Sequence, residues 1–148
     1  PPGMHFSLSH AGQYCMLAVG ACPLGLDLEM HQAGSAALQQ LIPYVMQPAE
    51  QQRLANLNEA GQICIFYRHW VAKEAFLKFK GVGLQFPLGQ CRVTMVVGNA
   101  SAAIDWQKGP TDSERGVVKF LPLSDGWVGA VAAEGNDWTV RLGEWTFD

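Results

Sequence analysis

Residues 63–79 read ICIFYRHWVAKEAFLKF and predict the longest helix of the chain, with Gly81 as its stop signal. At about 100° per residue, Glu74 falls inside the apolar stripe of this helix, beside Trp70. A carboxylate buried there without a partner would be strongly destabilising. We therefore expect either an ion pair with Lys78, one helical turn later, or a metal ion shared with other acids. The apolar stripe itself consists of Ile63, Phe66, Tyr67, Trp70 and Leu77.

A second informative stretch, residues 24–29, reads LGLDLE. As a strand it turns its leucines to one face and Gly25, Asp27 and Glu29 to the other. Two carboxylates only ~6–7 Å apart along a strand repel each other unless a cation lies between them, and oxygen ligands of this kind suit Mg²⁺ or Ca²⁺. Taken alone, the pair fits a solvated edge strand better. Together with Glu74 it favours a metal site.

The remaining sequence predicts short strands before the helical region and more strands after it. Pro43 is expected to end the first helix, and Glu50 to be a helix-start acid that complements the helix dipole. Three strands, three helices and about five further strands indicate an α+β fold, an antiparallel sheet packed with a long helix. The predicted strands are 5–10, 14–20, 24–29, 91–97, 102–106, 117–121, 127–133 and 138–145, and the predicted helices are 35–42, 48–57 and 63–79.

Length and composition describe one folded domain. The 148 residues are 49% hydrophobic and 16% charged, which excludes a disordered or low-complexity chain. A net charge of −3 argues against a nucleic-acid-binding surface. Residues 53–92 nevertheless carry six bases against two acids, which suits an anionic ligand or an acidic partner, or simply a solvated helix face.

The four cysteines lack zinc-site spacing, and Cys15 and Cys64 lie in apolar runs. We expect buried free thiols in a reducing cytoplasm. No run reaches the about 18 apolar residues that a transmembrane helix needs. A lone histidine such as His10 is more often structural than functional, and by itself it carries no site. The opening residue, Pro1, predicts that the chain begins after a cut.

Four short motifs nevertheless follow one another in an ordered series. They are Ser9-His10, Gly25-Leu26-Asp27-Leu28-Glu29, Trp70-Val71-Ala72-Lys73-Glu74-Ala75-Phe76-Leu77-Lys78 and Gly81-Val82-Gly83. In this order and spacing the chain resembles the 4′-phosphopantetheinyl transferase superfamily, in particular the surfactin-synthetase-activating type that serves peptide and polyketide synthetases. The resemblance spans residues 6–88, and Ser7 stands where that family often has Asn.

The resemblance implies a Mg²⁺-dependent transfer of the 4′-phosphopantetheine arm of coenzyme A to a serine of an acyl or peptidyl carrier protein, releasing 3′,5′-ADP. Asp27, Glu29 and Glu74 would hold the metal. Glu74 would also activate the serine hydroxyl, and Lys78 would assist the departing phosphate. Phosphoryl transfer needs charge neutralisation and in-line positioning more than a protein nucleophile, which agrees with these residue types. Coenzyme A contacts are implied for Ser9, His10, Lys73 and Lys78.

The resemblance also implies that residues 1–148 form one domain, equivalent to the second half and tail of a two-half pseudo-dimer. A missing N-terminal half or a homo-oligomer would then complete the coenzyme A pocket. One alternative is a catalytically incomplete half-domain that binds coenzyme A, a carrier protein or a partner subunit without turnover. Another is a metal-dependent nuclease, but its lysine follows the acid by two places, whereas Lys78 follows Glu74 by four.

Overall fold

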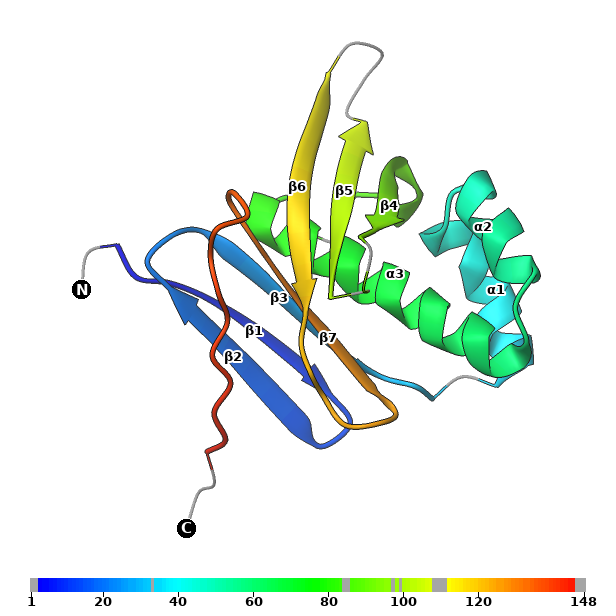
Figure 1. Cartoon of the computed structure of the whole chain (residues 1–148), viewed down its shortest axis with the longest axis horizontal. Coiled ribbons are helices and arrows are strands. Elements are labelled where there is room, and N and C mark those ends of the chain that lie inside the picture. The colour runs from blue at the N-terminus through cyan, green and yellow to red at the C-terminus, as the bar shows by residue number, and fades with distance from the viewer. Residues whose placement is uncertain are drawn as a thin grey trace.

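The computed structural model describes residues 3–32, 34–83, 86–96, 98, 100–107 and 112–145, and it has the predicted α+β architecture (Figure 1). Strands precede and follow a group of helices. The elements are β1 (His5–Ala11), β2 (Tyr14–Gly20), β3 (Leu24–Met30), α1 (Ser35–Val45), α2 (Pro48–Ala55), α3 (Glu59–Lys80), the short 3-10 helix η2 (Leu88–Gln90), β4 (Cys91–Met95), β5 (Ser101–Gln107), β6 (Ser113–Phe120) and β7 (Trp127–Ala133).

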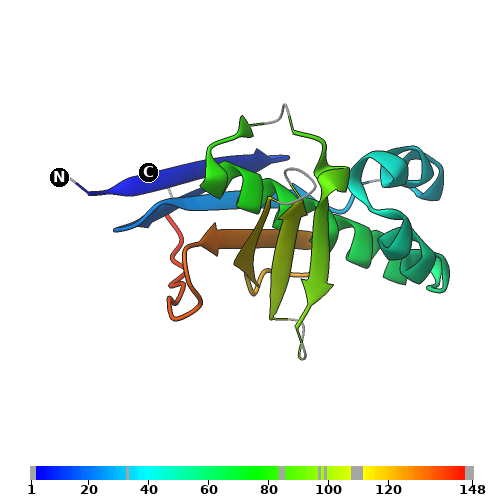
Figure 2. The ribbon, with the colours of Figure 1, turned by 90° about the horizontal axis from the view of Figure 1, so that it is seen from above.

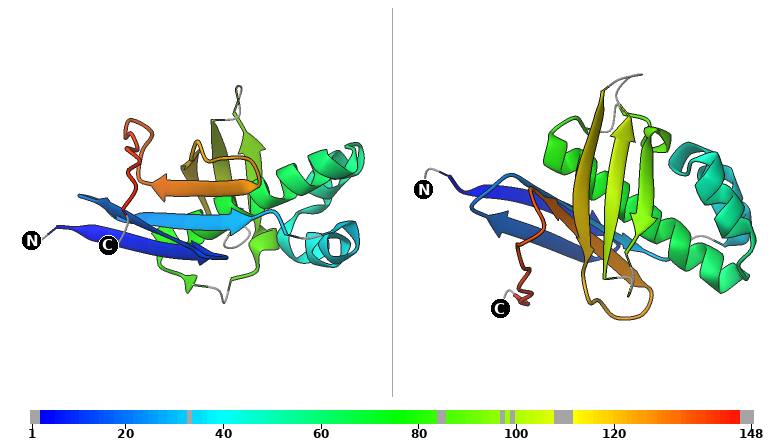
Figure 3. Two further views of the ribbon diagram at one scale, coloured as in Figure 1. Left: turned by 90° about the horizontal axis from the view of Figure 1, so that it is seen from below. Right: turned by 45° about the horizontal axis from the view of Figure 1, so that its top comes forward.

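Five strands form one antiparallel sheet in the order β3-β7-β6-β5-β4. The sheet is strongly twisted, so that β4, β5 and β6 cross the direction of β3 and β7 (Figure 2). The long helix α3 packs across one face of this sheet, while α1 and α2 lie at the N-terminal end of α3, away from the β1–β2 hairpin (Figure 3).

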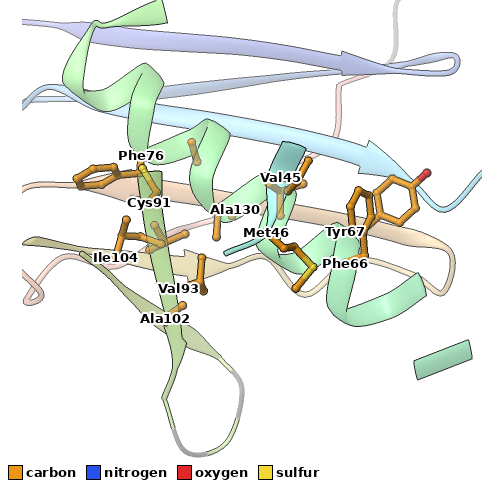
Figure 4. Close-up of a cluster of buried hydrophobic side chains, with 14 of the residues drawn as sticks. Val45, Met46, Phe66, Tyr67, Phe76, Cys91, Val93, Ala102, Ile104 and Ala130 are labelled. Carbon is orange, nitrogen blue, oxygen red and sulfur yellow. The ribbon is translucent and has the colours of Figure 1, made fainter. Parts of the chain in front are cut away.

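The main hydrophobic core lies between α3, the sheet and the α1–α2 pair (Figure 4). The predicted stripe is correct for Phe66, Tyr67 and Leu77, which are buried. Beyond the stripe, Val71 and Phe76 are also fully buried, because other elements enclose the C-terminal half of α3 more widely than one stripe requires. A smaller core on the opposite face of the sheet contains Leu26, Leu121 and Val131.

Gly25 sets the distance between β3 and α3. A Cβ atom at this position would lie 2.0 Å from the carbonyl oxygen of Ala75 and 2.3 Å from the backbone nitrogen of Phe79. The strand and helix backbones are therefore in contact here, which only glycine permits. Because Asp27 and Glu29 share a strand face with Gly25, the same contact turns both acids toward the helix.

The β1–β2 hairpin turns the serines of β1 toward β3 and a largely apolar face toward solvent. The Oγ atoms of Ser7 and Ser9 accept hydrogen bonds from the backbone nitrogens of Leu26 and Leu28, at 2.9 and 3.1 Å. These serines satisfy donors along the free edge of β3 that would otherwise lack a partner. The outer face carries Phe6, Leu8, Leu17 and Val19, each more than half exposed.

Several predicted boundaries are wrong. Pro43 does not end α1, which continues to Val45, since a proline removes only one hydrogen bond so near a helix end. The helix α3 begins at Glu59 rather than Ile63, because Asn58 caps it by accepting a hydrogen bond from the backbone of Gly61 at 2.9 Å. Smaller shifts affect α2, which ends at residue 55, and β6, which begins at 113.

The predicted last strand, residues 138–145, does not form. Trp138 packs against the smaller core instead, and Lys119 Nζ donates hydrogen bonds to the carbonyl oxygens of Asn136 and Trp138. These contacts hold the segment by side chains rather than by a β-ladder. In the strand predicted over 91–97, β4 ends at Met95 and Val97 lies outside the described residues.

The prediction of buried thiols is wrong for Cys15, Cys22 and Cys64, which are exposed, and right for Cys91. Cys15 lies opposite His10 on the exposed outer face of the hairpin. All four cysteines are unpaired. Within the described ranges, no helix combines the length and apolar character that a membrane crossing requires.

Candidate functional site

Four charged side chains lie near one another where β3 crosses α3. Asp27 and Glu29 come from the strand, and Glu74 and Lys78 come from one face of the helix. Lys78 Nζ lies 2.7 Å from Asp27 Oδ1 and 3.0 Å from the carbonyl oxygen of Leu26. Lys78 therefore forms its ion pair with Asp27 on the strand, and not with Glu74 one helical turn earlier, as one of the two predicted alternatives had it. We call these four side chains the acid cluster.

All three carboxylates have raised pKa values, and burial is the largest cause for each of them. Burial raises the pKa of Asp27, although hydrogen bonds from Lys78 and Ser9 oppose the shift. The pKa of Glu29 is raised to about 7, first by burial and then by the charges of Asp27 and Glu74. Burial and the charge of Asp27 also raise the pKa of Glu74. Fully ionised, the cluster would hold more negative charge than Lys78 alone can balance.

The two oxygens of Asp27 lie in different surroundings. Oδ1 accepts hydrogen bonds from Ser9 Oγ at 3.1 Å and from Lys78 Nζ. Oδ2 is buried and has no hydrogen-bond partner among the described residues. Burying a carboxylate oxygen without a hydrogen-bond partner costs folding free energy. A bound ion is one explanation for such an atom. The solvated acidic face that β3 alone suggests is thus replaced by a buried one.

The donor set is suited to a hard divalent cation. All three acids offer oxygen ligands, and three carboxylates face a single ammonium group, so that the fully ionised cluster carries two excess negative charges. Among the residues that the structure describes, no three His, Cys, Asp or Glu side chains already converge as a preformed metal site. The residues present fit a cation in ligand type and in charge. Asp27 Oδ2, which has no hydrogen-bond partner among the described residues, is the oxygen available to it.

The remaining predicted site residues are placed differently. Ser9 is buried and contacts Asp27, so the structure brings it to the acid cluster. His10 is exposed on the outer face of the hairpin, and Ser9 lies on the inner face. The sequence shows that Ser7 and Ser9 share one face of β1. It does not show that this polar face would turn inward to β3.

Lys73 is not brought to the acid cluster. Its ammonium is fully buried, 2.7 Å from Glu50 Oε2 and 2.6 Å from the carbonyl oxygen of Val45. The position of Lys73 therefore gives no support to the coenzyme A contact that the resemblance implies. Consecutive helical residues point about 100° apart, so Lys73 faces α2 while Glu74 faces β3.

Glu50 connects three elements, a role that sequence reasoning missed. It is a helix-start acid as predicted, because its Oε2 accepts a hydrogen bond from the backbone of Gln47 at 2.8 Å. Its Oε1 also accepts from the backbone nitrogen of Val93 on β4 at 2.6 Å. With Lys73 on α3, the buried carboxylate therefore joins α2, α3 and β4. The sequence gives no signal for this distant pair, because Arg53, three residues after Glu50, is a nearer candidate partner.

His69 lies beside this pair and predicts an acid-sensitive contribution to stability. Burial lowers the pKa of His69 below its ordinary 6.5, with Lys73 and Arg53 acting in the same direction and Glu50 opposing them. A lowered pKa means that the native state binds this proton more weakly than the unfolded state. The stabilisation by neutral His69 is therefore complete above pH 6.5 and is lost as the pH falls below that value.

We expect His69→Gln to flatten the pH dependence of the free energy of unfolding on the acid side of neutrality. Urea titrations at a series of pH values measure that slope. The exposed His10 provides the matched control, and His10→Gln should leave the slope unchanged. An unaltered slope in His69→Gln would contradict the assignment.

The fold and the site together define an α+β domain with an acid cluster between one strand and one long helix. Residues 23–132 match the 4′-phosphopantetheinyl transferase superfamily, and the chain belongs to that superfamily. A 4′-phosphopantetheinyl transferase of Bacillus subtilis is 33% identical over 94 residues, which cover 64% of this chain and 41% of that protein. The transferase HetI of Nostoc is 29% identical over 141 residues, covering 95% of this chain and 56% of HetI. The chain thus spans about two fifths of the Bacillus relative.

Among solved structures, the chain is similar to a holo-[acyl-carrier-protein] synthase from Neisseria meningitidis. The TM-score is 0.54 at 15% sequence identity, and the match covers 76% of this chain and 98% of the other. At this identity the likeness concerns the fold alone. It confirms the predicted α+β arrangement of an antiparallel sheet and a long helix.

Proposed function

We propose that this chain transfers the 4′-phosphopantetheine arm of coenzyme A to a serine of an acyl or peptidyl carrier protein, with release of 3′,5′-ADP. The observation that carries the proposal is the acid cluster, in which a buried Asp27 has one free oxygen and shares its surroundings with Glu29 and Glu74. All three acids belong to the sequence motifs that carry the resemblance to the superfamily. The four unpaired cysteines suit a reducing compartment such as the cytoplasm.

The proposed reaction requires Mg²⁺, held by Asp27, Glu29 and Glu74. When bound, the ion would supply neutralisation of the pyrophosphate charge. We also assign Glu74 the role of accepting the proton of the carrier serine hydroxyl. The serine oxygen forms a bond to the phosphorus that bears pantetheine, and the bond from that phosphorus to the 3′,5′-ADP oxygen breaks.

Two bases have proposed roles toward the phosphates of coenzyme A. Lys78 is about one third exposed, so its ammonium can reach both Asp27 and a bound phosphate. There it would stabilise the charge that develops on the departing oxygen. His10 is exposed and available for a phosphate contact. We assign Lys73 no such role, because it is fully buried and paired with Glu50.

Labelling of a carrier protein tests the proposal. The chain is incubated with coenzyme A carrying a fluorescent group on its thiol, a carrier protein and Mg²⁺, and the label on the carrier is followed on a gel. We expect the carrier to be labelled. EDTA should abolish the labelling, and a carrier that lacks its acceptor serine should remain unlabelled. Calorimetry with coenzyme A and Mg²⁺ distinguishes the outcomes: binding without labelling would replace transfer by a non-catalytic half-domain, and neither binding nor labelling would reject both.

The outer face of the β1–β2 hairpin favours a second role, that of a domain completed by a partner subunit. Phe6 is 73% exposed, and Leu8, Leu17 and Val19 lie beside it on the same face. A contiguous apolar sheet face of this kind is typical of an interaction surface. The first 26 residues contain no Asp, Glu, Lys or Arg, so two copies of this face would meet without charge repulsion. We propose that residues 1–148 form one domain that pairs with a second copy through this face.

The double variant Phe6→Ser, Leu17→Ser is expected to weaken this association. Sedimentation equilibrium over a range of protein concentrations should show a monomer–dimer equilibrium for the unaltered chain and monomers for the variant. Tyr44→Ser provides the control, because Tyr44 is 75% exposed on α1, away from the hairpin. An unaltered chain that stays monomeric throughout would exclude self-association.

A further inference from the structure

A cavity of about 300 Å³ lies between β2, the sheet and the segment that follows β7. Leu26, Leu121 and Val131, the buried members of the smaller core, form part of its wall. Side chains alternate along a strand, so Leu26 and Asp27 point to opposite faces of β3. The cavity therefore lies on the other side of β3 from the acid cluster, and the proposed transfer reaction makes no use of it.

Residues 138–142 form one wall of this cavity without pairing as a strand. In the part of the chain that the structure describes, no backbone–backbone hydrogen bond joins them to another segment. Lys119 holds the start of this wall, at the carbonyl oxygen of Trp138. Further along, Val140 and Leu142 are 39% and 48% exposed. The wall can therefore move outward to admit a ligand without breaking a β-ladder.

The lining of the cavity combines apolar side chains with a single charge. Of the described residues that line it, only Thr139 and Arg141 are polar. Arg141 is exposed, which places it at the rim. The acids nearest to it in sequence, Asp137 and Glu144, do not line the cavity. The interior is therefore apolar, and the mouth carries a positive charge.

We propose that this cavity binds an aliphatic carboxylate, such as a fatty-acid anion. The chain occupies the apolar interior, because removing apolar surface from water is favourable. The carboxylate pairs with Arg141, since a guanidinium group matches a carboxylate in charge and in shape. The volume lies at the lower end of the about 300–1,000 Å³ of small-molecule pockets, which suits a single slender chain.

Isothermal titration of the unaltered chain with decanoate tests the proposal. We expect saturable binding at a single site. Decanol keeps the chain without the charge and should bind about 5- to 10-fold more weakly, and acetate keeps the charge without the chain and should not bind measurably. Decylamine, which has the opposite charge, should bind more weakly than decanol. Equal binding of decylamine and decanoate would overturn the proposal.

Two pairs of variants locate the ligand. Arg141→Gln should weaken decanoate binding about 5- to 10-fold and leave decanol binding unchanged. Arg92→Gln is its control, because Arg92 is an exposed arginine on β4 that does not line the cavity. Ala18→Leu narrows the cavity and should weaken the binding of both ligands. Phe6→Ser is its control, because Phe6 is exposed on the outer face of the hairpin and lies outside the cavity wall.

The opposite pattern would contradict the cavity as the site. If Phe6→Ser lost decanoate binding and a folded Ala18→Leu kept it, the ligand would lie on the outer face of the hairpin and the proposal would be overturned. Thermal unfolding establishes that each variant is folded.

Fluorescence gives a second measurement, which decides the question if Ala18→Leu does not fold. A bromine atom quenches the fluorescence of a tryptophan that it contacts, so decanoate with bromine at the end of its chain should quench Trp138 in the cavity wall. Trp138→Phe should remove this quenching. Trp127→Phe should keep it, because Trp127 packs against Tyr14 and does not line the cavity.

The outcomes are separate from those of the transfer assay. Quenching that persists in Trp138→Phe, or the absence of saturable decanoate binding by the unaltered chain, would overturn the proposal and leave carrier labelling untouched. Failure of carrier labelling would reject the transfer reaction and leave the cavity proposal standing, because decanoate binding is measured without coenzyme A, Mg²⁺ or carrier protein.

Discussion

Asp27→Ala is expected to lower the rate of carrier-protein labelling by at least ~100-fold, the size of effect seen when one preorganised electrostatic group is removed from an active site. The variant loses the free oxygen of the acid cluster and the partner of Lys78. It also relieves the repulsion that raises the pKa of Glu29 and Glu74. Activity should therefore fall while stability changes little or increases.

The measurement is the initial rate of carrier labelling with Mg²⁺ in excess. Asp27→Asn tests whether charge or shape matters, because it keeps the size of the side chain and removes the ionised oxygen. Asp105→Ala is the control on the outside of the sheet, where Asp105 pairs with Arg92 and Arg115 at 3.0 and 2.7 Å. Undiminished labelling by Asp27→Ala would reject the metal assignment.

Lys73→Met should lower the free energy of unfolding by about 3–5 kcal/mol, because it leaves the buried carboxylate of Glu50 without its cation. Lys73 is fully buried and Glu50 is 3% exposed, so water cannot replace the lost partner. The change also leaves the carbonyl oxygen of Val45 without this donor. Chemical denaturation followed by tryptophan fluorescence gives the value.

Two further variants test whether the loss comes from the uncompensated charge. Adding Glu50→Gln to Lys73→Met should recover part of the stability, since Gln is neutral and still offers an acceptor to the backbone of Val93. Lys80→Met removes the ion pair between Lys80 and Glu114, in which the Lys80 side chain is about one quarter exposed. This change should lower the free energy of unfolding by less than ~1 kcal/mol. If Lys73→Met were as mild as Lys80→Met, the buried pair would be irrelevant to folding.

The candidate site illustrates which parts of this molecule can be predicted locally. The alternation in residues 24–29 correctly places Asp27 and Glu29 on one strand face, and helical spacing correctly places Glu74 and Lys78 on one helix face. The α+β class follows from the same two periodicities. That both faces meet depends on Gly25, whose missing side chain lets the backbones touch.

Other features could not be predicted because they depend on distant partners. Phe6 and Leu8 alternate with Ser7 and Ser9, a pattern that normally buries its apolar side, yet here the serines face inward toward the free edge of β3. The choice of partner for Lys73 depends on where α2 delivers Glu50, 23 residues earlier in the chain.

Residue order alone establishes the secondary-structure elements, the positions of the motifs and membership of a family with this fold, because each depends on spacing over a few residues or on a match in sequence. Tertiary packing decides that Lys78 pairs with Asp27, that Lys73 is withdrawn into the core, and that one face of the hairpin stays uncovered. These outcomes arise from competition for buried hydrogen-bond partners between segments far apart in the chain. Local periodicity contains no information about that competition.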